Sequence, residues 1–245
     1  MESIYQLGKY ILMLKSLFVK PEQLSMYWKE TLLQMHKIGV GSIIIIFIIS
    51  FFIGAVSAVQ FAYNLSSTIT PMYFVGYIVK ESMILEFAPT VSCLILAGKV
   101  GYNIASELGT MRLTEQIDAL EIMGLNVTSY LIGPKFIAAD TMIPLLVVFS
   151  AIIGIGGGML ACMASGYVSS TEYIQGVLSW FVPLNAYIMM IKAFVFSFLL
   201  VSISCFKGYY AKGGAIEIGI ASTQAVVLSS VAVLISDYLI AWIVL

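Results

Sequence analysis

Six charged residues lie close together in one stretch of an otherwise apolar chain. The chain is 60% hydrophobic and only 10% charged, but residues 97–124 read AGKVGYNIASELGTMRLTEQIDALEIMG. Because long apolar runs flank this polar island on both sides, we expect it to lie in water between two membrane-spanning helices. Its charged residues are Lys99, Glu107, Arg112, Glu115, Asp118 and Glu121.

Charged side chains at this spacing are typical of a docking surface. If residues 103–123 form a helix, Glu115, Asp118 and Glu121 share one drifting face, because residues three apart are neighbours. A rough apolar stripe follows another face, at Ile104, Leu108, Met111, Ile117 and Leu120. We expect this helix to bind a cytoplasmic partner, and the alternative is a solvated loop helix without a partner.

Three further charged residues, Glu86, Lys192 and Asp237, fall inside three different apolar stretches. An ionised side chain at membrane depth costs several kcal/mol unless it is paired, hydrated or neutralised. Two interpretations stay open at this point. The residues form ion pairs that bridge helices, or they serve transport directly, as the proton relay of a stand-alone secondary transporter would.

The sequence does not contain the motifs of ATP hydrolysis or metal binding. A phosphate-binding loop reads G-x-x-x-x-G-K-[ST], and the closest string, ending in Gly98-Lys99, begins with Cys93. Val100 replaces its hydroxyl residue. His36 is the single histidine and no C-x-x-C pair occurs, so a metal or haem site is not indicated. A net charge of −1 does not suggest nucleic acid, and we expect a non-catalytic chain without a cofactor.

The apolar pattern predicts an all-α polytopic membrane protein. Mean hydropathy is +1.01, and about 20 apolar residues suffice to cross the hydrocarbon layer. We expect five spans, at residues 38–62, 73–96, 134–164, 185–206 and 220–243. Loops are expected at residues 63–72, 166–184 and 207–219, within a single domain over residues 1–245.

Residues 1–37 are too polar to span and have the pattern of interfacial helices. Apolar residues in the first helix recur every three or four positions, which is the spacing of one helical face. These residues are Ile4, Leu7, Ile11, Leu14 and Phe18. Pro21 interrupts that helix, and a second short helix around residues 22–36 leads to the membrane.

Lysine and arginine are distributed unevenly along the chain. With five spans, ten of the twelve fall on one side, and the loops at 63–72 and 166–184 contain none. Since positively charged loops stay in the cytoplasm, we expect the N-terminus and the polar island there and the C-terminus in the periplasm. The ten lie at positions 9, 15, 20, 29, 37, 99, 112, 135, 207 and 212, and the other two are Lys80 and Lys192.

The polar island resembles the signature of MlaE-type (YrbE) permeases, which typically read AGR-x-G-x-x-x-x-AELGTM-x-x-TEQIDAL-x-x-MG. The later run YYAKGGAIEIGIASTQAVVLSSVAVLISDYLI is similar to a second motif of that family, which an acidic residue follows in the last span. LEFAP at 85–89 and GPKFIA at 133–138 extend the resemblance over essentially the whole chain. Three arginines common in the family are replaced here by Leu85, Lys99 and Ile220, which weakens any expectation about headgroup charge.

The resemblance implies the permease subunit of an ABC transporter in the bacterial inner membrane, moving phospholipid between inner and outer membranes to maintain lipid asymmetry. It implies partners: a second copy, a dimer of cytoplasmic ATPase subunits, a periplasmic hexamer of MCE-domain proteins and, in some systems, a STAS-domain subunit. The ATPase-docking residues would be Glu107, Arg112, Glu115, Gln116, Asp118 and Glu121. A lipid cavity between the copies would be lined by Glu86, Leu85, Met83, Lys192 and Asp237. A membrane scaffold that anchors an MCE protein without moving lipid is a further alternative.

Overall fold

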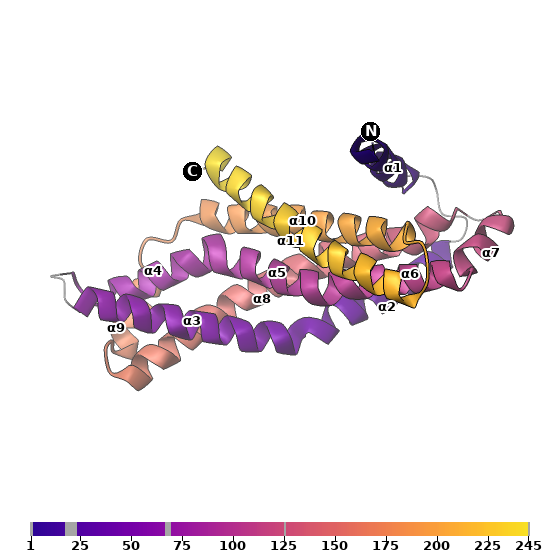
Figure 1. The fold of residues 1–245 in the computed structure, drawn as a ribbon. Helices are drawn as coiled ribbons and strands as arrows, with labels where there is room; N and C mark the ends of the chain where they lie inside the picture. The colour runs from indigo at the N-terminus through magenta and orange to yellow at the C-terminus, as the bar shows by residue number, and fades with distance from the viewer. Residues whose placement is uncertain (1, 18–23, 67–69, 125, 245) are drawn as a thin grey trace. The chain divides into compact units, whose positions relative to one another are not determined.

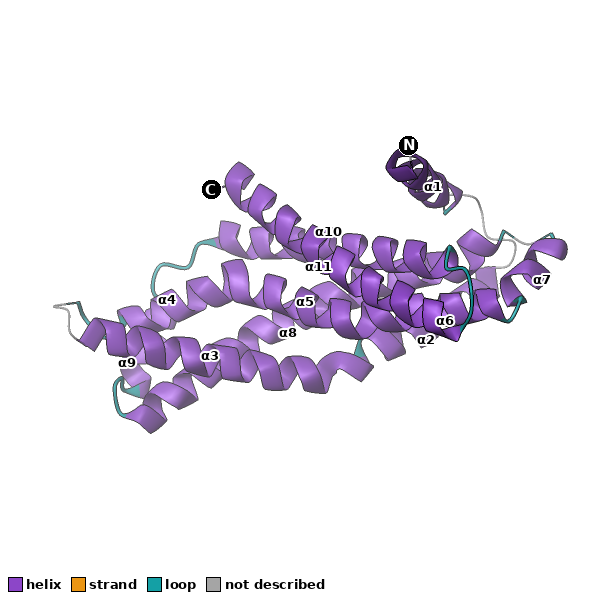
Figure 2. Cartoon of the chain, viewed as in Figure 1, coloured by secondary structure: helices purple, strands orange, loops and turns teal. Residues whose placement is uncertain are grey.

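The computed structural model describes residues 2–17, 24–66, 70–124 and 126–244, which form helices joined by short loops (Figures 1 and 2). No strand occurs among these residues. Five helical stretches are long and apolar enough to cross a membrane: Tyr27–Ser66, Phe74–Leu113, Thr128–Ser165, Pro183–Tyr209 and Ala215–Val244. The prediction of an all-α polytopic membrane protein with five spans is confirmed.

Two helices precede the first long one. They are α1 (Glu2–Ser16) and α2 (Leu24–Ile38), followed by the 3₁₀ turn η1 (Val40–Ser42) and the long helix α3 (Ile43–Ser66). Leu7 and Ile11 on α1 are exposed, as expected for an apolar face that a membrane would cover. Phe18 and Pro21 lie outside the described residues, and so does the side chain of Ile4.

The second span is continuous, but two π-helical segments interrupt its α-helical hydrogen bonding. Its parts are α4 (Phe74–Ser82), η2 (Met83–Val91), α5 (Ser92–Leu96), η3 (Ala97–Gly101) and α6 (Tyr102–Leu113). Pro89 lies inside η2 and has no N–H to give the carbonyl of Leu85, four residues earlier. The Leu85 oxygen therefore has no α-helical donor, and its lone pairs can accept a donor from outside the helix.

The polar island is not the single helix over 103–123 that the periodicity predicts. After a break at Thr114 and Glu115, α6 is followed by a separate helix, α7 (Gln116–Ile122). Glu115 is left-handed, with φ 57°, and an α-helix does not continue through that conformation. The Thr114 backbone N–H and its hydroxyl both donate to the Thr110 carbonyl, over 3.0 Å and 2.9 Å, and so close the last turn of α6.

The remaining spans follow in order. They are α8 (Gly133–Ser165), which the π-turn η4 (Thr128–Ile132) precedes, α10 (Pro183–Tyr209) and α11 (Ala215–Val244). The stretch 166–184, expected as a loop, contains a further helix, α9 (Ser170–Leu178). A capping box starts α9, because Ser169 and Glu172 each accept the backbone N–H of the other. The loop prediction is wrong for these residues. The S-x-x-E spacing of the capping box is visible in the sequence and could have predicted the start of α9.

Contacts within the chain divide it into two compact units. Unit 1 comprises Met1–Gly41, Leu96–Ile143 and Val195–Ser236, and unit 2 comprises Ser42–Ile95, Pro144–Phe194 and Asp237–Leu245. The chain passes from one unit to the other once within each of the five candidate spans. The ten lysines and arginines assigned to one side all belong to unit 1, whereas Lys80 and Lys192 belong to unit 2. The single-domain prediction remains a prediction.

Close helix crossings organise unit 2. A Cβ atom on Gly54 of α3 would overlap the carbonyl oxygen of Gly154 on α8, so this crossing requires glycine. A Cβ atom on Gly76 of α4 would likewise overlap the carbonyl oxygen of Tyr173 on α9. The first crossing lies beside η2, because a Cβ atom on Gly154 would also meet the Met83 side chain of η2, and η2 contacts α3; it therefore helps to fix the segment that carries Glu86.

In unit 1, α6 and α10 pack closely, and α1 is attached to α10. A Cβ atom on Gly208 would lie 2.6 Å from the carbonyl oxygen of Ala105. The Tyr10 hydroxyl donates to Ser202 Oγ over 2.8 Å, and the Tyr10 and Phe206 rings meet edge to face at 5.5 Å. These contacts fix the interfacial helix to the fourth span, and burial raises the pKa of the Tyr10 hydroxyl.

Candidate functional site

Glu86, Lys192 and Asp237 come from three different spans and meet in unit 2. The Lys192 ammonium lies 3.0 Å from Glu86 Oε1 and 2.7 Å from Asp237 Oδ1. It also donates to the Leu85 carbonyl over 2.8 Å, the oxygen that Pro89 leaves without an α-helical partner. The ammonium is fully buried, and it is surrounded by two hydrogen-bond acceptors, the Leu85 carbonyl and Glu86 Oε1, and by one ion-paired oxygen of Asp237. We call Glu86, Lys192 and Asp237 the Lys192 cluster.

The two carboxylates of the Lys192 cluster differ in exposure. The Glu86 side chain is 46% exposed and the Asp237 side chain 14%. Thr90 Oγ1 donates to Asp237 Oδ2 over 2.9 Å, so one oxygen of Asp237 is hydrogen-bonded and the other is ion-paired with Lys192. One ammonium and two carboxylates give a formal charge of −1. A phosphate headgroup could reach Lys192 only by displacing Glu86, because Glu86 is its accessible partner.

The two apolar residues expected in the lipid cavity occupy different environments. Leu85 is half-buried and contributes its backbone oxygen to the Lys192 cluster. Met83 is fully buried and packs against Gly154, where an added Cβ atom would overlap the Met83 side chain. Met83 therefore supports the packing of η2 on α8, and lipid contact stays a prediction for all five residues.

The residues predicted to dock on an ATPase are divided between α6 and α7 in unit 1. Arg112 Nη1 lies 2.7 Å from Asp118 Oδ1 and 3.9 Å from Glu121 Oε1. In one continuous helix, residues six apart would point about 120° away from each other. The break at Glu115 is therefore what brings Arg112 and Asp118 together. The Tyr209 hydroxyl donates to Glu121 Oε1 over 2.9 Å and attaches α7 to the end of α10.

The outer side of α6 and α7 combines fixed charge with uncovered apolar groups. Glu115 and Gln116 are exposed, Leu113 is exposed, and Ile122 is 87% exposed. Ile117, on the inner side of α7, is fully buried and anchors the short helix. An exposed surface that combines apolar and charged side chains on a fixed backbone is typical of a protein-binding site.

The family profile described as "Permease MlaE" matches residues 31–243. The chain belongs to the MlaE permease family. A probable ABC transporter permease protein of Rickettsia bellii is 38% identical over 215 residues, covering 88% of this chain and 83% of the relative. The intermembrane phospholipid transport system permease protein MlaE of Haemophilus influenzae is 31% identical over 238 residues, covering 96% and 90%. A probable ABC transporter permease protein of Synechocystis is 32% identical over 219 residues, covering 87% and 81%. With its five apolar helices, the chain is a multi-pass membrane permease.

In this MlaE-family permease, Glu107 has a contact that its place in the polar island does not indicate. Lys135 on α8 is buried, and its ammonium lies 2.7 Å from Glu107 Oε2. Lys37 at the end of α2 lies 3.8 Å from Glu107 Oε1. These residues, the Lys135 cluster, connect α6 to α8 and α2. Helical periodicity could not have predicted the Lys135 cluster, because its residues are far apart in the sequence.

A third buried lysine of the permease, Lys80, is tied to the end of α9. Its ammonium donates to the Ser179 carbonyl over 2.8 Å and lies 3.3 Å from Glu81 Oε1. Asn185, at the start of α10, donates to the other oxygen of Glu81. A cation at a helix C-terminus interacts favourably with the helix dipole, so Lys80 stabilises the connection between α4, α9 and α10.

Proposed function

We propose that this MlaE-family permease is the membrane subunit of an ABC transporter that moves phospholipid between the inner and outer bacterial membranes. The main observation behind the proposal is the α6–α7 surface. Arg112 and Tyr209 fix it to the rest of unit 1 through Asp118 and Glu121, while Leu113 and Ile122 are exposed on its outer side. The names of the Rickettsia and Haemophilus relatives, a probable ABC transporter permease and a phospholipid transport system permease, support it. Energy would come from a dimer of separate ATPase subunits, since this sequence has no phosphate-binding loop.

Co-purification tests the docking of this surface on the ATPase. A tagged chain carrying Glu115→Lys and Asp118→Lys should insert in the membrane but lose the ATPase, because like charges placed against an interface cost several kcal/mol. Glu115→Lys alone separates the interface effect from loss of the Arg112–Asp118 pair. The matched control is Lys29→Glu, a charge reversal at an exposed position of α2. Wild-type recovery of the ATPase by the double variant would refute the proposed docking.

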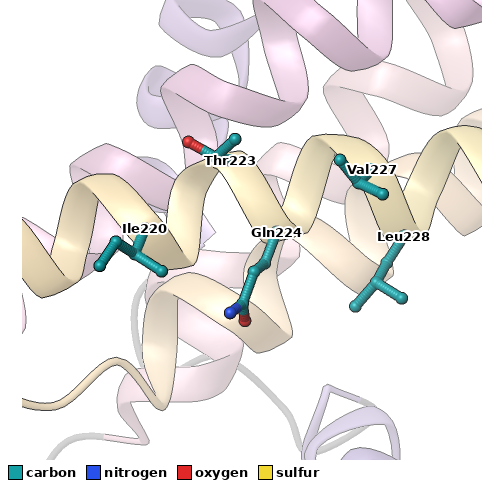
Figure 3. Close-up of a pocket in the computed structure, with 5 residues that line it drawn as sticks. All are labelled: Ile220, Thr223, Gln224, Val227 and Leu228. Atoms are coloured by element: carbon teal, nitrogen blue, oxygen red, sulfur yellow. The ribbon is translucent and has the colours of Figure 1, made fainter.

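The same proposal places a second copy of the chain against α11. Only 11% of the most apolar stretch of α11 is buried, against 61% for α10, so α11 is the span with more surface left to cover. Figure 3 shows Thr223 and Val227 on one flank of α11, away from Gln224 and Leu228. Leu228 also lines a groove between α1, α10 and α11, so the flank of Thr223 and Val227 is the one left for a second copy. Val227→Cys should form a disulfide-linked dimer, and Leu228→Cys, on the other flank, should not.

The lipid would approach the Lys192 cluster from the side of Glu86. An apolar groove of about 400 Å³ is lined by Phe87, the residue after Glu86 in η2, and by Phe52, Val56 and Gln60 of α3, which suits an acyl chain. A photo-crosslinker at Phe87 should capture phospholipid in the assembled complex. The rival proton-relay transporter would instead move its substrate with a proton gradient and without an ATPase.

The proposed topology has the N-terminus in the cytoplasm of an inner-membrane protein and the C-terminus in the periplasm. All ten lysines and arginines of unit 1 support it. A cysteine at Ser170 should label from the periplasm and one at Ala211 only from the cytoplasm; labelling of both from one side would overturn it. The MCE-domain hexamer and the STAS-domain subunit are proposed as partners from the family resemblance alone.

A further inference from the structure

A groove in unit 1 has one polar end and a long apolar wall. It lies between α1, α10 and α11 and has a volume of about 640 Å³, within the range of small-molecule sites, roughly 300–1,000 Å³. Gln6, Tyr10 and Lys207 supply the polar groups, and the wall along α11 includes Val231 and Ile235. All of these residues belong to unit 1, whereas the Lys192 cluster belongs to unit 2.

The length of this groove matches one leaflet of a bilayer. Lys207 of α10, at the polar end, is hydrogen-bonded to Gln224 of α11. Ile235 lies eleven residues after Gln224 on α11. At 1.5 Å per residue this is about 16 Å, close to half of a hydrocarbon core of roughly 30 Å. A molecule that fills the groove would have its polar part at the membrane surface and an apolar part that reaches toward the midplane.

Lys207 differs from the buried lysines in the kind of partner it has. The amine of each buried lysine lies within 3.3 Å of a carboxylate oxygen: Lys80, Lys135 and Lys192. The one contact found for Lys207 among the described residues is a long hydrogen bond, 3.3 Å, to the neutral amide of Gln224. Its positive charge is therefore not neutralised by the protein, and its remaining donors can take an anion.

A second uncompensated amine lies beside the groove. Lys9 follows the lining residues Gln6 and Leu7 on α1, and its ammonium lies 4.6 Å from the Tyr5 ring and 5.3 Å from the Tyr210 ring. Both partners are again neutral. No acidic side chain is found among the described residues that line the groove. The charge at this end of the groove is thus positive, which favours an anionic ligand.

We propose that this groove binds one anionic phospholipid, with its phosphate at Lys207 and Lys9 and an acyl chain along Val231 and Ile235. Basic pockets between membrane helices are known to hold anionic headgroups in this way. The lipid would be a resident component that joins the interfacial helix α1 to α10 and α11, separate from any transported lipid. Its binding is independent of the proposed function, and only its assignment to the cytoplasmic leaflet rests on the proposed topology.

Native mass spectrometry of the full-length chain tests the site, with phosphatidylglycerol and phosphatidylcholine of identical acyl chains as probes. The wild type should retain one phosphatidylglycerol in preference to phosphatidylcholine. Lys207→Gln should weaken phosphatidylglycerol binding about five-fold, the equivalent of about 1 kcal/mol for one basic side chain, and Lys207→Arg should preserve it. The matched control is Lys212→Gln, which removes the same charge from an exposed position outside the groove. Equal effects of the Lys207 and Lys212 variants would show general charge attraction and overturn the proposal.

A photo-crosslinker at Val231 tests the occupant in a bilayer that contains both lipids. It should capture phosphatidylglycerol in excess over its share of the bilayer, and Lys207→Gln should abolish the excess. Ala232→Leu, which fills the groove without touching its charge, should reduce the capture as well. Lipid captured in the bilayer ratio would overturn the proposal, and so would a crosslink to a second copy or to another membrane helix.

Discussion

Both units bury a lysine, but they surround it differently. In unit 2, Lys192 faces two carboxylates, those of Glu86 and Asp237. In unit 1, Lys135 faces the single carboxylate of Glu107, which Lys37 shares. The formal charge is therefore −1 in the Lys192 cluster and +1 in the Lys135 cluster. In each cluster, one residue is paired with two residues of opposite charge: Lys192 in unit 2 and Glu107 in unit 1. We expect that single residue to contribute most to the stability of its cluster.

The largest effect is expected for Lys192→Met. It leaves two carboxylates and the Leu85 carbonyl without their cation, and removing one partner of a buried ion pair costs about 3–5 kcal/mol. The thermal unfolding temperature of the purified permease should fall sharply. The triple variant Lys192→Met/Glu86→Gln/Asp237→Asn, which removes all charge, should recover much of the loss. An unchanged unfolding temperature in the single variant would contradict the central role of Lys192.

In unit 1 the corresponding change is Glu107→Gln. It leaves the buried Lys135 without a carboxylate, and we expect a loss near the lower end of the same range, about 3 kcal/mol, because the Glu107 side chain is 39% exposed. The opposite change, Lys135→Met, should be much milder, since Glu107 keeps water and Lys37. A larger fall in the thermal unfolding temperature for Lys135→Met than for Glu107→Gln would contradict this difference between the clusters.

A smaller effect on stability is expected for Glu86→Gln. Lys192 keeps Asp237 and Leu85, and a glutamine can still accept a hydrogen bond from it, so we expect a loss of no more than about 1 kcal/mol, the net value of an ordinary hydrogen bond. If lipid enters by displacing Glu86, transport should change more than the unfolding temperature does. Measuring both in one preparation separates the two roles, and a large drop in stability with normal transport would assign Glu86 to structure alone.

The smallest effect is expected for Thr90→Val. The substitution removes the hydrogen bond to Asp237 but keeps the shape of the side chain, and such bonds within membrane proteins contribute about 0.6 kcal/mol on average. Thr90→Ser, which keeps the hydroxyl, is the control. In the Lys192→Met background the loss of Thr90 should matter more, since its hydroxyl is then the remaining partner of Asp237. Additive effects would show that Thr90 and Lys192 do not act on the same carboxylate.

Local patterns in the sequence predict much of this fold. Apolar length alone predicts the five spans, because the membrane imposes the same requirement on each helix independently. The helix α9 is also encoded locally, by the capping box of Ser169 and Glu172. The missing α-helical donor of the Leu85 carbonyl could have been predicted from Pro89, because proline cannot supply the hydrogen bond to a residue four positions earlier.

Other features depend on contacts that the sequence pattern does not contain. The break at Glu115 accompanies the pairing of Arg112 with Asp118, and the pairing exists only in the broken form. The Lys135 cluster joins three segments that are distant in the sequence, so Glu107 is indistinguishable from its neighbours in the polar island by spacing. Periodicity could show that the island is charged, but not which of its carboxylates faces inward.

We propose that a separate ATPase drives this permease through the α6–α7 surface. The most direct test is ATP-dependent phospholipid movement by the purified complex in sided liposomes, measured for the wild type, Glu115→Lys/Asp118→Lys and Lys29→Glu. We expect lipid movement that requires ATP, is lost with the double variant and is kept with the control. Lipid movement by the permease alone, driven by a proton gradient and unaffected by the double variant, would contradict it.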